Sequence, residues 1–155
     1  MLYLVRHAKA GDRNEWTGED WLRPLSRRGQ MQALDLLDVF RDVHIDRLIS
    51  SWYVRCAETL VPLAGERRIA IEIAEPLAEE SSLDDALALV RKHAHHDAVF
   101  CSHGDVIPML LEHFASRGLD LGPAPQCAKG SIWVIEFHAT GEPLRARYLP
   151  PPEGT

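Results

Sequence analysis

Residues 1–12 read MLYLVRHAKAGD, and this stretch is the key to the fold. Four apolar residues, Leu2 to Val5, run directly into Arg6 and His7, and Lys9 follows. A continuous apolar run without polar alternation is typical of a parallel strand that is buried on both faces. Open α/β sheets bind their ligands at the carboxyl ends of such strands. The stretch therefore predicts a buried strand that carries Arg6 and His7 to a functional edge.

The rest of the chain repeats this pattern. Short apolar strands are expected at 48–49, 69–73 and 98–101, and they alternate with helices expected to follow Ser26 and to cover 54–64, 82–90 and 106–114. Residues 132–137 and 144–149 read as a closing antiparallel pair that turns at Thr140 and Gly141. This alternation predicts a three-layer α/β/α sandwich whose central sheet is largely parallel with an antiparallel edge. We expect one domain over residues 1–149 and a C-terminal tail over 150–155.

Composition excludes several classes of protein. The 155 residues carry a formal net charge of -6, so general nucleic-acid binding, which depends on excess Lys and Arg, is not expected. No apolar run approaches the ~20 residues of a membrane span, so no membrane partner is expected either. Three widely spaced cysteines form neither a disulfide framework nor a zinc pattern, which favours a cytoplasmic location. The sequence does not indicate an oligomeric state.

Polar groups follow each predicted parallel strand at its carboxyl end. In chain order these groups are Arg6 with His7, Ser51 with Arg55, Glu79 with Glu80, and His103 with Gly104. Because the carboxyl ends of parallel strands share one edge of the sheet, we expect these groups to converge.

The residue types in this set suit phosphoryl transfer. Two arginines can each grip a phosphoryl group through paired N–H donors, and a neutral imidazole is a competent nucleophile toward phosphorus. His7 could donate from its other ring nitrogen to a backbone carbonyl, which would fix the tautomer. His103 precedes a helix whose N-terminus favours anions, and a nearby carboxyl group could protonate the leaving group.

Five motifs, in order along the chain, resemble the histidine phosphatase superfamily, which includes the cofactor-dependent phosphoglycerate mutases. They are LVRHAKAG, DWLRPLSRRGQMQA, LISSWYVRCAETLVPLA, AEPLAEE and VFCSHGDVIPML. The resemblance implies a phosphoglycerate mutase-like fold and a phosphohistidine formed on His7. It also implies that Arg6, Arg55 and His103 hold the phosphoryl group, that Glu79 is the proton donor, and that no cofactor or metal takes part.

Several assignments stay open at this stage. Glu80, Asp12 and Asp20 are alternatives to Glu79 as the general acid. Candidate substrate contacts are Lys9, Ser51, Gly104 and Lys129. Trp16, Trp21 and Trp52 either frame a substrate face or serve packing. His93, His95 and His96 are interpreted as a solvated helix end rather than a metal site, because their spacing does not place all three together.

The resemblance is compatible with more than one substrate. RHAKAG and RPLS look most like small SixA-type phosphohistidine phosphatases, which act on a phosphorylated protein. WYVRCAETLVPLA and KGSIWVIEF are also similar to a histidine phosphatase domain associated with Nudix hydrolases, although no Nudix box is present. The leading hypothesis is a metal-independent, SixA-like phosphohistidine phosphatase. The alternatives are a phosphomonoesterase for a small phosphorylated metabolite or nucleotide, and a non-enzymatic domain that binds phosphorylated ligands.

Overall fold

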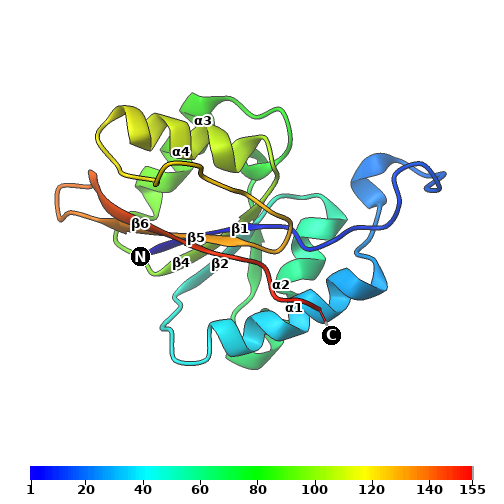
Figure 1. The fold of residues 1–155 in the computed structure, drawn as a ribbon. Coiled ribbons are helices and arrows are strands. Elements are labelled where there is room, and N and C mark those ends of the chain that lie inside the picture. Colours follow the sequence, from blue (N-terminus) through cyan, green and yellow to red (C-terminus); the bar gives the residue numbers. More distant parts are fainter. Residues whose placement is uncertain (155) are drawn as a thin grey trace.

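A computed structural model describes residues 1–154 and shows a six-stranded mixed sheet between two pairs of helices (Figure 1). The strands are β1 (Leu2–Arg6), β2 (Arg47–Ser50), β3 (Ile71–Ile73), β4 (Ala98–Ser102), β5 (Ile132–Phe137) and β6 (Pro143–Leu149). Their order in the sheet is β3-β2-β4-β1-β5-β6. The first four are mutually parallel, whereas β5 runs antiparallel to both β1 and β6. The predicted three-layer sandwich with an antiparallel edge is confirmed.

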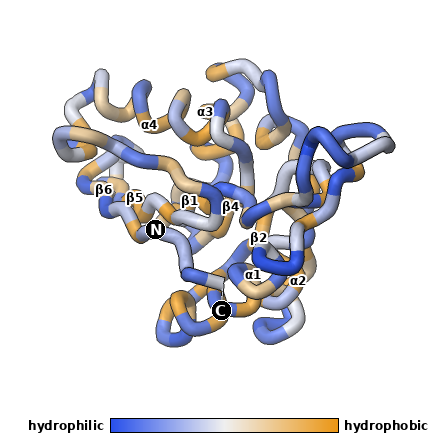
Figure 2. Tube along the Cα trace, turned by 45° about the vertical axis from the view of Figure 1, so that its right-hand side comes forward, coloured by the Kyte–Doolittle hydropathy of each residue, from blue (hydrophilic) through white to orange (hydrophobic). Residues whose placement is uncertain are grey.

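Two helices cover each face of the sheet. The helices α1 (Arg27–Val39) and α2 (Val54–Arg67) pack on one face, and α3 (Leu83–Lys92) and α4 (Val106–Ser116) on the other (Figure 1). Each pair closes its own hydrophobic cluster, one around Leu36, Leu60 and Leu63 and the other around Leu87, Leu110 and Phe114. Hydrophobic residues therefore concentrate along the helices and strands, while the loop that precedes α1 is mostly hydrophilic (Figure 2). None of the described helices is both long and apolar enough to cross a bilayer.

The N-terminal caps of the helices agree with the sequence prediction, whereas the bounds of some other elements differ from it. Ser26 and Ser82 cap α1 and α3 by accepting from the backbone N–H three residues on. The predicted strand at 69–73 begins only at Ile71, because α2 continues to Arg67 and a left-handed Arg68 then turns the chain. Two short 3₁₀ helices, η1 (Asp20–Leu22) and η2 (Glu75–Leu77), lie between the predicted helices and strands.

The C-terminal segment lies against α1 rather than projecting from the domain. Gln32 Nε2 donates to the carbonyl of Pro152, and Arg28 Nε donates to the carbonyl of Glu153. The same Gln32 side chain accepts from the backbone N–H of Lys9 on the loop after β1. One α1 side chain thus joins the C-terminal segment to the loop that follows the predicted functional strand.

Candidate active site

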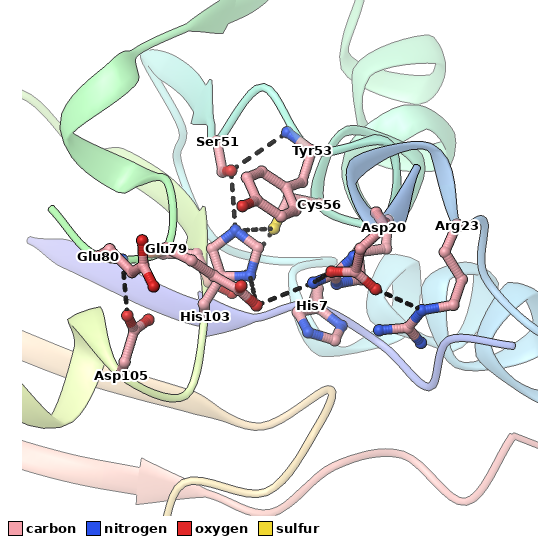
Figure 3. Close-up of polar contacts among 12 residues, drawn as sticks. His7, Asp20, Arg23, Ser51, Tyr53, Cys56, Glu79, Glu80, His103 and Asp105 are labelled. Atoms are coloured by element: carbon pink, nitrogen blue, oxygen red, sulfur yellow. Dashed lines mark hydrogen bonds and ion pairs between the residues drawn. The ribbon is translucent and has the colours of Figure 1, made fainter. Parts of the chain in front are cut away.

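Side chains from the ends of β1, β2 and β4, and from the segment after β3, meet at the carboxyl edge of the sheet (Figure 3). We call Arg6, His7, Arg55 and His103 the four-residue centre. The rings of His7 and His103 are 5.5 Å apart between centroids. The predicted convergence of these residues is therefore present.

His7 is buried and held in one orientation. Its Nδ1 lies 2.8 Å from the carbonyl oxygen of Ala8, so Nδ1 carries the hydrogen and Nε2 keeps a free electron pair. Burial lowers the pKa of His7 to about 3, and the positive charges of His103, Arg55 and Arg6 act in the same direction. His7 is therefore neutral near pH ~7, as a nucleophile must be.

The loop that carries His7 is fixed by three contacts with the helices beneath it. The N–H of Ala8 donates to Thr59 Oγ1 at 3.0 Å, and the N–H of Lys9 donates to Gln32 Oε1 at 2.9 Å. Gly29 allows α1 to approach so closely that a Cβ there would lie 1.9 Å from the carbonyl oxygen of Lys9. The backbone of Lys9 is thus part of the scaffold, while its side chain is exposed.

Arg6 lies over Gly104. A Cβ at Gly104 would be 2.7 Å from Arg6 Cζ, so only glycine leaves room for the guanidinium at this position. Arg6 Nη1 donates to the carbonyl of Cys127 at 2.7 Å, which fixes the other side of the group. The structure thus gives Gly104 a steric role toward Arg6, and its predicted contact with substrate stays a prediction.

Arg55 is fully buried and joins two carboxylates. Its Nη1 donates to the backbone carbonyl of Asp20 at 2.9 Å, and its Nη2 reaches Asp20 Oδ2 at 3.1 Å and Glu79 Oε1 at 2.8 Å. The guanidinium also lies over the ring of Tyr53, 4.8 Å from its centroid. Arg55 therefore brings the loop before α1 and the segment after β3 to the same point.

The carboxylates differ in how they are placed. Glu79 Oε1 lies 3.4 Å from His103 Nδ1 as well as next to Arg55. Burial acts to raise the pKa of Asp20, but hydrogen bonds and charge from Arg23 and Arg55 outweigh it and leave that pKa lowered. Asp12 instead accepts from the backbone of Asn14 on the exposed loop. Of these groups, Glu79 is the carboxylate that contacts both Arg55 and His103, and it lacks the ion pair with Arg23 that Asp20 makes.

The turn that carries Glu79 is strained and is held from α4. Glu80 adopts a left-handed conformation with φ of 66°, which costs about 1 kcal/mol or more for a residue with a Cβ. Its N–H donates to Asp105 Oδ2 at 2.8 Å, while Asp105 Oδ1 caps α4 by accepting from Val106. Asp105 therefore couples the position of Glu79 to the helix that follows His103. The alternative acid, Glu80, contributes its backbone here and has an exposed side chain.

Ser51 orients the ring of His103 through a contact with its Nε2 atom. Ser51 Oγ accepts from the N–H of Tyr53 at 3.2 Å and lies 2.8 Å from His103 Nε2. A hydroxyl that donates to Nε2 leaves the hydrogen of the neutral ring on Nδ1, which faces Glu79. Ser51 is completely buried, and this contact gives it a role in positioning His103, while its predicted contact with substrate stays a prediction.

The thiol of Cys56 lies 3.5 Å from the same His103 nitrogen. Burial acts to raise the pKa of Cys56, but hydrogen bonds with Cys101 and His103 outweigh it and lower that pKa to about 6. His103 Nε2 thus has two polar neighbours, Ser51 Oγ and Cys56 Sγ.

Within residues 1–154, three buried N–H groups of the centre donate to no acceptor. They are Arg6 Nε, Arg55 Nε and His103 Nδ1, the last of which lies 3.4 Å from Glu79 Oε1 without forming a hydrogen bond to it. Unpaired buried donors are costly and rare in folded proteins. All three belong to the four-residue centre, which also contains the neutral imidazole of His7, and N–H donors of this kind suit the oxygens of an anion such as a phosphoryl group.

The remaining candidates lie around this centre. Lys129 is exposed, and desolvation together with the positive charges of Arg6 and Arg23 lowers its pKa. Trp16, Trp21 and Trp52 are each 38–40 % exposed, so none is a core residue.

Two groups of histidines and acids lie outside the centre. Among the described residues, ligand atoms of His44, Asp46 and Asp97 come within 4.8 Å of one another, at the opposite edge of the sheet, where Asp97 pairs with the N-terminal ammonium at 3.0 Å. The prediction of a wholly solvated end for α3 was wrong for His93, which is buried and packs edge-on against Phe100 because the helix ends over the sheet.

Sequence reasoning missed the residues that support the site rather than form it. Arg23 is buried and binds both the Asp20 carboxylate and the carbonyl of Gly11. Thr59, Gln32 and Asp105 act through hydrogen bonds to backbone groups far away in the sequence. The RPLS motif was the available signal for Arg23, whereas the other three carried none.

A sequence comparison gives the chain a curated relative of known activity. It is 35% identical to the 8-oxo-(d)GTP phosphatase of Mycolicibacterium smegmatis (strain ATCC 700084 / mc(2)155) over an alignment that covers 98% of this chain. The alignment covers 48% of that relative, so the chain spans about half the length of the relative.

Solved structures share the fold. The protein histidine phosphatase SixA complexed with tungstate superposes with a TM-score of 0.73 at 16% identity, covering 99% of this chain and 96% of that one. A phosphohistidine phosphatase SixA from Agrobacterium tumefaciens gives a TM-score of 0.71 at 21% identity, with coverages of 97% and 96%. The sequence model of the histidine phosphatase superfamily (branch 1) matches residues 2–85. The chain belongs to the histidine phosphatase superfamily.

Proposed function

We propose that the protein hydrolyses a phosphoryl group through a phosphohistidine formed on Nε2 of His7. The observation that carries this proposal is the set of three unpaired buried donors, Arg6 Nε, Arg55 Nε and His103 Nδ1, beside a neutral imidazole. The donors would neutralise the charge that spreads over the phosphoryl oxygens in the transition state.

In the first step, the electron pair of His7 Nε2 attacks phosphorus. The bond from phosphorus to the leaving atom breaks, and the leaving group takes a proton from the carboxyl group of Glu79. His7 needs no separate base, since its low pKa already keeps it unprotonated.

In the second step, water attacks the phosphorus of the phosphohistidine. The Glu79 carboxylate accepts a proton from this water, and the P–N bond breaks as its electron pair returns to His7. Inorganic phosphate leaves, and Glu79 is again protonated for the next cycle. Glu79 suits both steps because its Oε1 lies beside Arg55 and His103.

Two substrate classes remain candidates for this centre. A SixA-like protein phosphohistidine is favoured by the RHAKAG and RPLS motifs. A small phosphorylated molecule, and a nucleotide in particular, is favoured by the curated relative named as an 8-oxo-(d)GTP phosphatase. An imidazole leaving group needs less acid assistance than an alcohol, so the two classes are separable by kinetics.

A phosphatase panel on wild type and His7→Ala, run with a chelator, tests the proposal. The panel contains a phosphohistidine protein, nucleotides and sugar phosphates. We expect chelator-resistant turnover by wild type and a loss of about a thousandfold or more in His7→Ala. Turnover no higher than background in wild type and in His7→Ala alike would support a domain that only binds phosphorylated ligands, whereas true turnover that is unchanged in His7→Ala would contradict the role of His7 as nucleophile. Loss of turnover with the chelator would contradict a metal-independent mechanism.

A further inference from the structure

An open cleft of about 610 Å³ lies next to the four-residue centre. It is lined by Trp52, residues 75–76 and 78–82, and Asp85. Glu79 lines this cleft and also contacts Arg55 and His103 of the four-residue centre. The cleft, which we call the Trp52 cleft, is therefore next to the place where the phosphoryl group would bind.

A row of aromatic rings connects Trp52, on one wall of the cleft, with the four-residue centre. Trp52 contacts Trp21 edge-on at 5.4 Å between centroids and lies 4.6 Å from Tyr53. The ring of Tyr53 in turn lies 4.6 Å from that of His103. Neither Trp21 nor Trp52 belongs to a hydrophobic core cluster, and each is about 40% exposed. Exposed aromatic groups of this size beside a catalytic centre are typical of a ligand surface.

The other wall presents carboxylates. Glu75, Glu79, Glu80 and Asp85 all line the Trp52 cleft. Ionised carboxylates accept hydrogen bonds and do not donate them, and they repel phosphate. A ligand that fits both the cleft and the centre thus has a phosphoryl group at one end and a flat ring with N–H donors at the other.

We propose that the Trp52 cleft binds the base of a nucleotide whose terminal phosphoryl group lies on the four-residue centre. This inference rests on the proposed function. The base stacks on Trp52, because stacking on an aromatic face is available to every base. The carboxylates accept from the base edge, and guanine, which carries two N–H donor groups side by side, satisfies them best.

Trp52→Leu tests the stacking contact, with Trp16→Leu as the matched control. Trp16 is exposed to a similar degree but does not line the cleft. We expect Trp52→Leu to raise KM for GMP and GDP by about 10-fold or more and to leave glycerol phosphate, which has no base, unchanged. Trp16→Leu should change neither. Equal effects on GMP and glycerol phosphate would overturn the proposal.

The double variant Glu75→Gln, Asp85→Asn tests the carboxylate wall. Wild type should prefer GMP to IMP, which lacks the exocyclic amino group, and the double variant should reduce that preference. Wild type without preference for nucleotides over glycerol phosphate would overturn the base subsite while leaving the phosphatase intact. Slower turnover of a phosphohistidine protein alone in Trp52→Leu would show that the cleft binds peptide and would overturn it too.

Binding to His7→Gln separates this proposal from the proposed function. Titration of GMP into this variant, with and without Trp52→Leu, measures affinity without turnover. We expect the added Trp52→Leu change to weaken GMP by about 10-fold or more and to leave inorganic phosphate unaffected. Equal GMP affinities in the two variants would overturn the base subsite, whatever the panel shows for catalysis.

Discussion

The backbone N–H of Glu80 donates to Asp105 Oδ2 at 2.8 Å, and this bond ties the turn carrying Glu79 to the start of α4. Glu80 is left-handed at this point, so the turn is held in a conformation that it would otherwise leave. Because Glu79 contacts Arg55 and His103, the bond to Asp105 positions the proposed general acid without touching it.

Asp105→Ala should therefore weaken the acid step selectively. We expect turnover of alkyl phosphates, whose leaving groups need a proton, to fall by about 10-fold to 100-fold, while that of phosphoramidates falls much less. Glu79→Gln should show the same pattern more strongly. Steady-state kinetics on both substrate types measures the effect.

Two further variants control this experiment. Asp105→Asn keeps one acceptor oxygen and should retain more activity than Asp105→Ala. Asp42→Ala removes an exposed carboxylate outside the centre and should have no effect. An equal loss on both substrate types in Asp105→Ala would remove Asp105 from this positioning role, and the same result in Glu79→Gln would remove Glu79 from the acid role.

Gly104→Ala should displace Arg6. The new Cβ would lie 2.7 Å from Arg6 Cζ, so the guanidinium must move and its grip on phosphate weakens. We expect kcat/KM to fall by about 10-fold to 100-fold. Gly65→Ala is the control, since its Cβ would meet nothing within 4 Å and alanine should stabilise α2 by about 0.5–1 kcal/mol. Full activity in Gly104→Ala would show that the position of Arg6 does not limit catalysis.

The low pKa of His7 has a measurable effect on stability. The folded protein holds His7 at a pKa of about 3 against 6.5 for the free group, so the unfolded chain binds more protons between these values. Stability from this source is complete above about pH 6.5 and is lost toward about pH 3, at up to about 1.4 kcal/mol per pH unit. His7→Asn removes this term, so its melting temperature should fall less than that of wild type between about pH 7 and pH 4.5. Parallel melting curves would contradict the burial argument.

Ser51→Ala should change catalysis through the tautomer of His103. Loss of the hydroxyl frees His103 Nε2, so the ring can carry its hydrogen on either nitrogen. We expect kcat to fall by about 10-fold and the pH profile of kcat/KM to shift, with Ser51→Thr restoring part of the activity. An unchanged pH profile in Ser51→Ala would indicate a packing role alone.

The sequence predicted the elements that depend on local pattern. The apolar run before Arg6 and His7 gave β1, helical spacing gave α1 to α4, and the ends of the parallel strands gave the four-residue centre. These predictions succeeded because burial periodicity and strand direction are properties of neighbouring residues.

The contacts between distant segments could not be predicted in the same way. Asp105 and Glu80 are 25 residues apart, and Arg55 and Asp20 are 35 apart, so no local pattern relates them. The same limit explains why the contacts of Ser51 with His103 and of Gly104 with Arg6 were not predicted. His103 and Arg6 lie far from Ser51 and Gly104, respectively, in the sequence, and the sheet brings each pair together.

Trapping the phosphoenzyme is the most direct test that a phosphohistidine forms on His7. Wild type is mixed with substrate, quenched in alkali, which preserves phosphohistidine, and digested for mass spectrometry, with His7→Gln and His103→Gln treated in parallel. We expect one phosphoryl group on the peptide that contains His7 in wild type, and none on any peptide of His7→Gln. A phosphorylated peptide that persists in His7→Gln, or turnover by wild type with no phosphohistidine at His7, would contradict it.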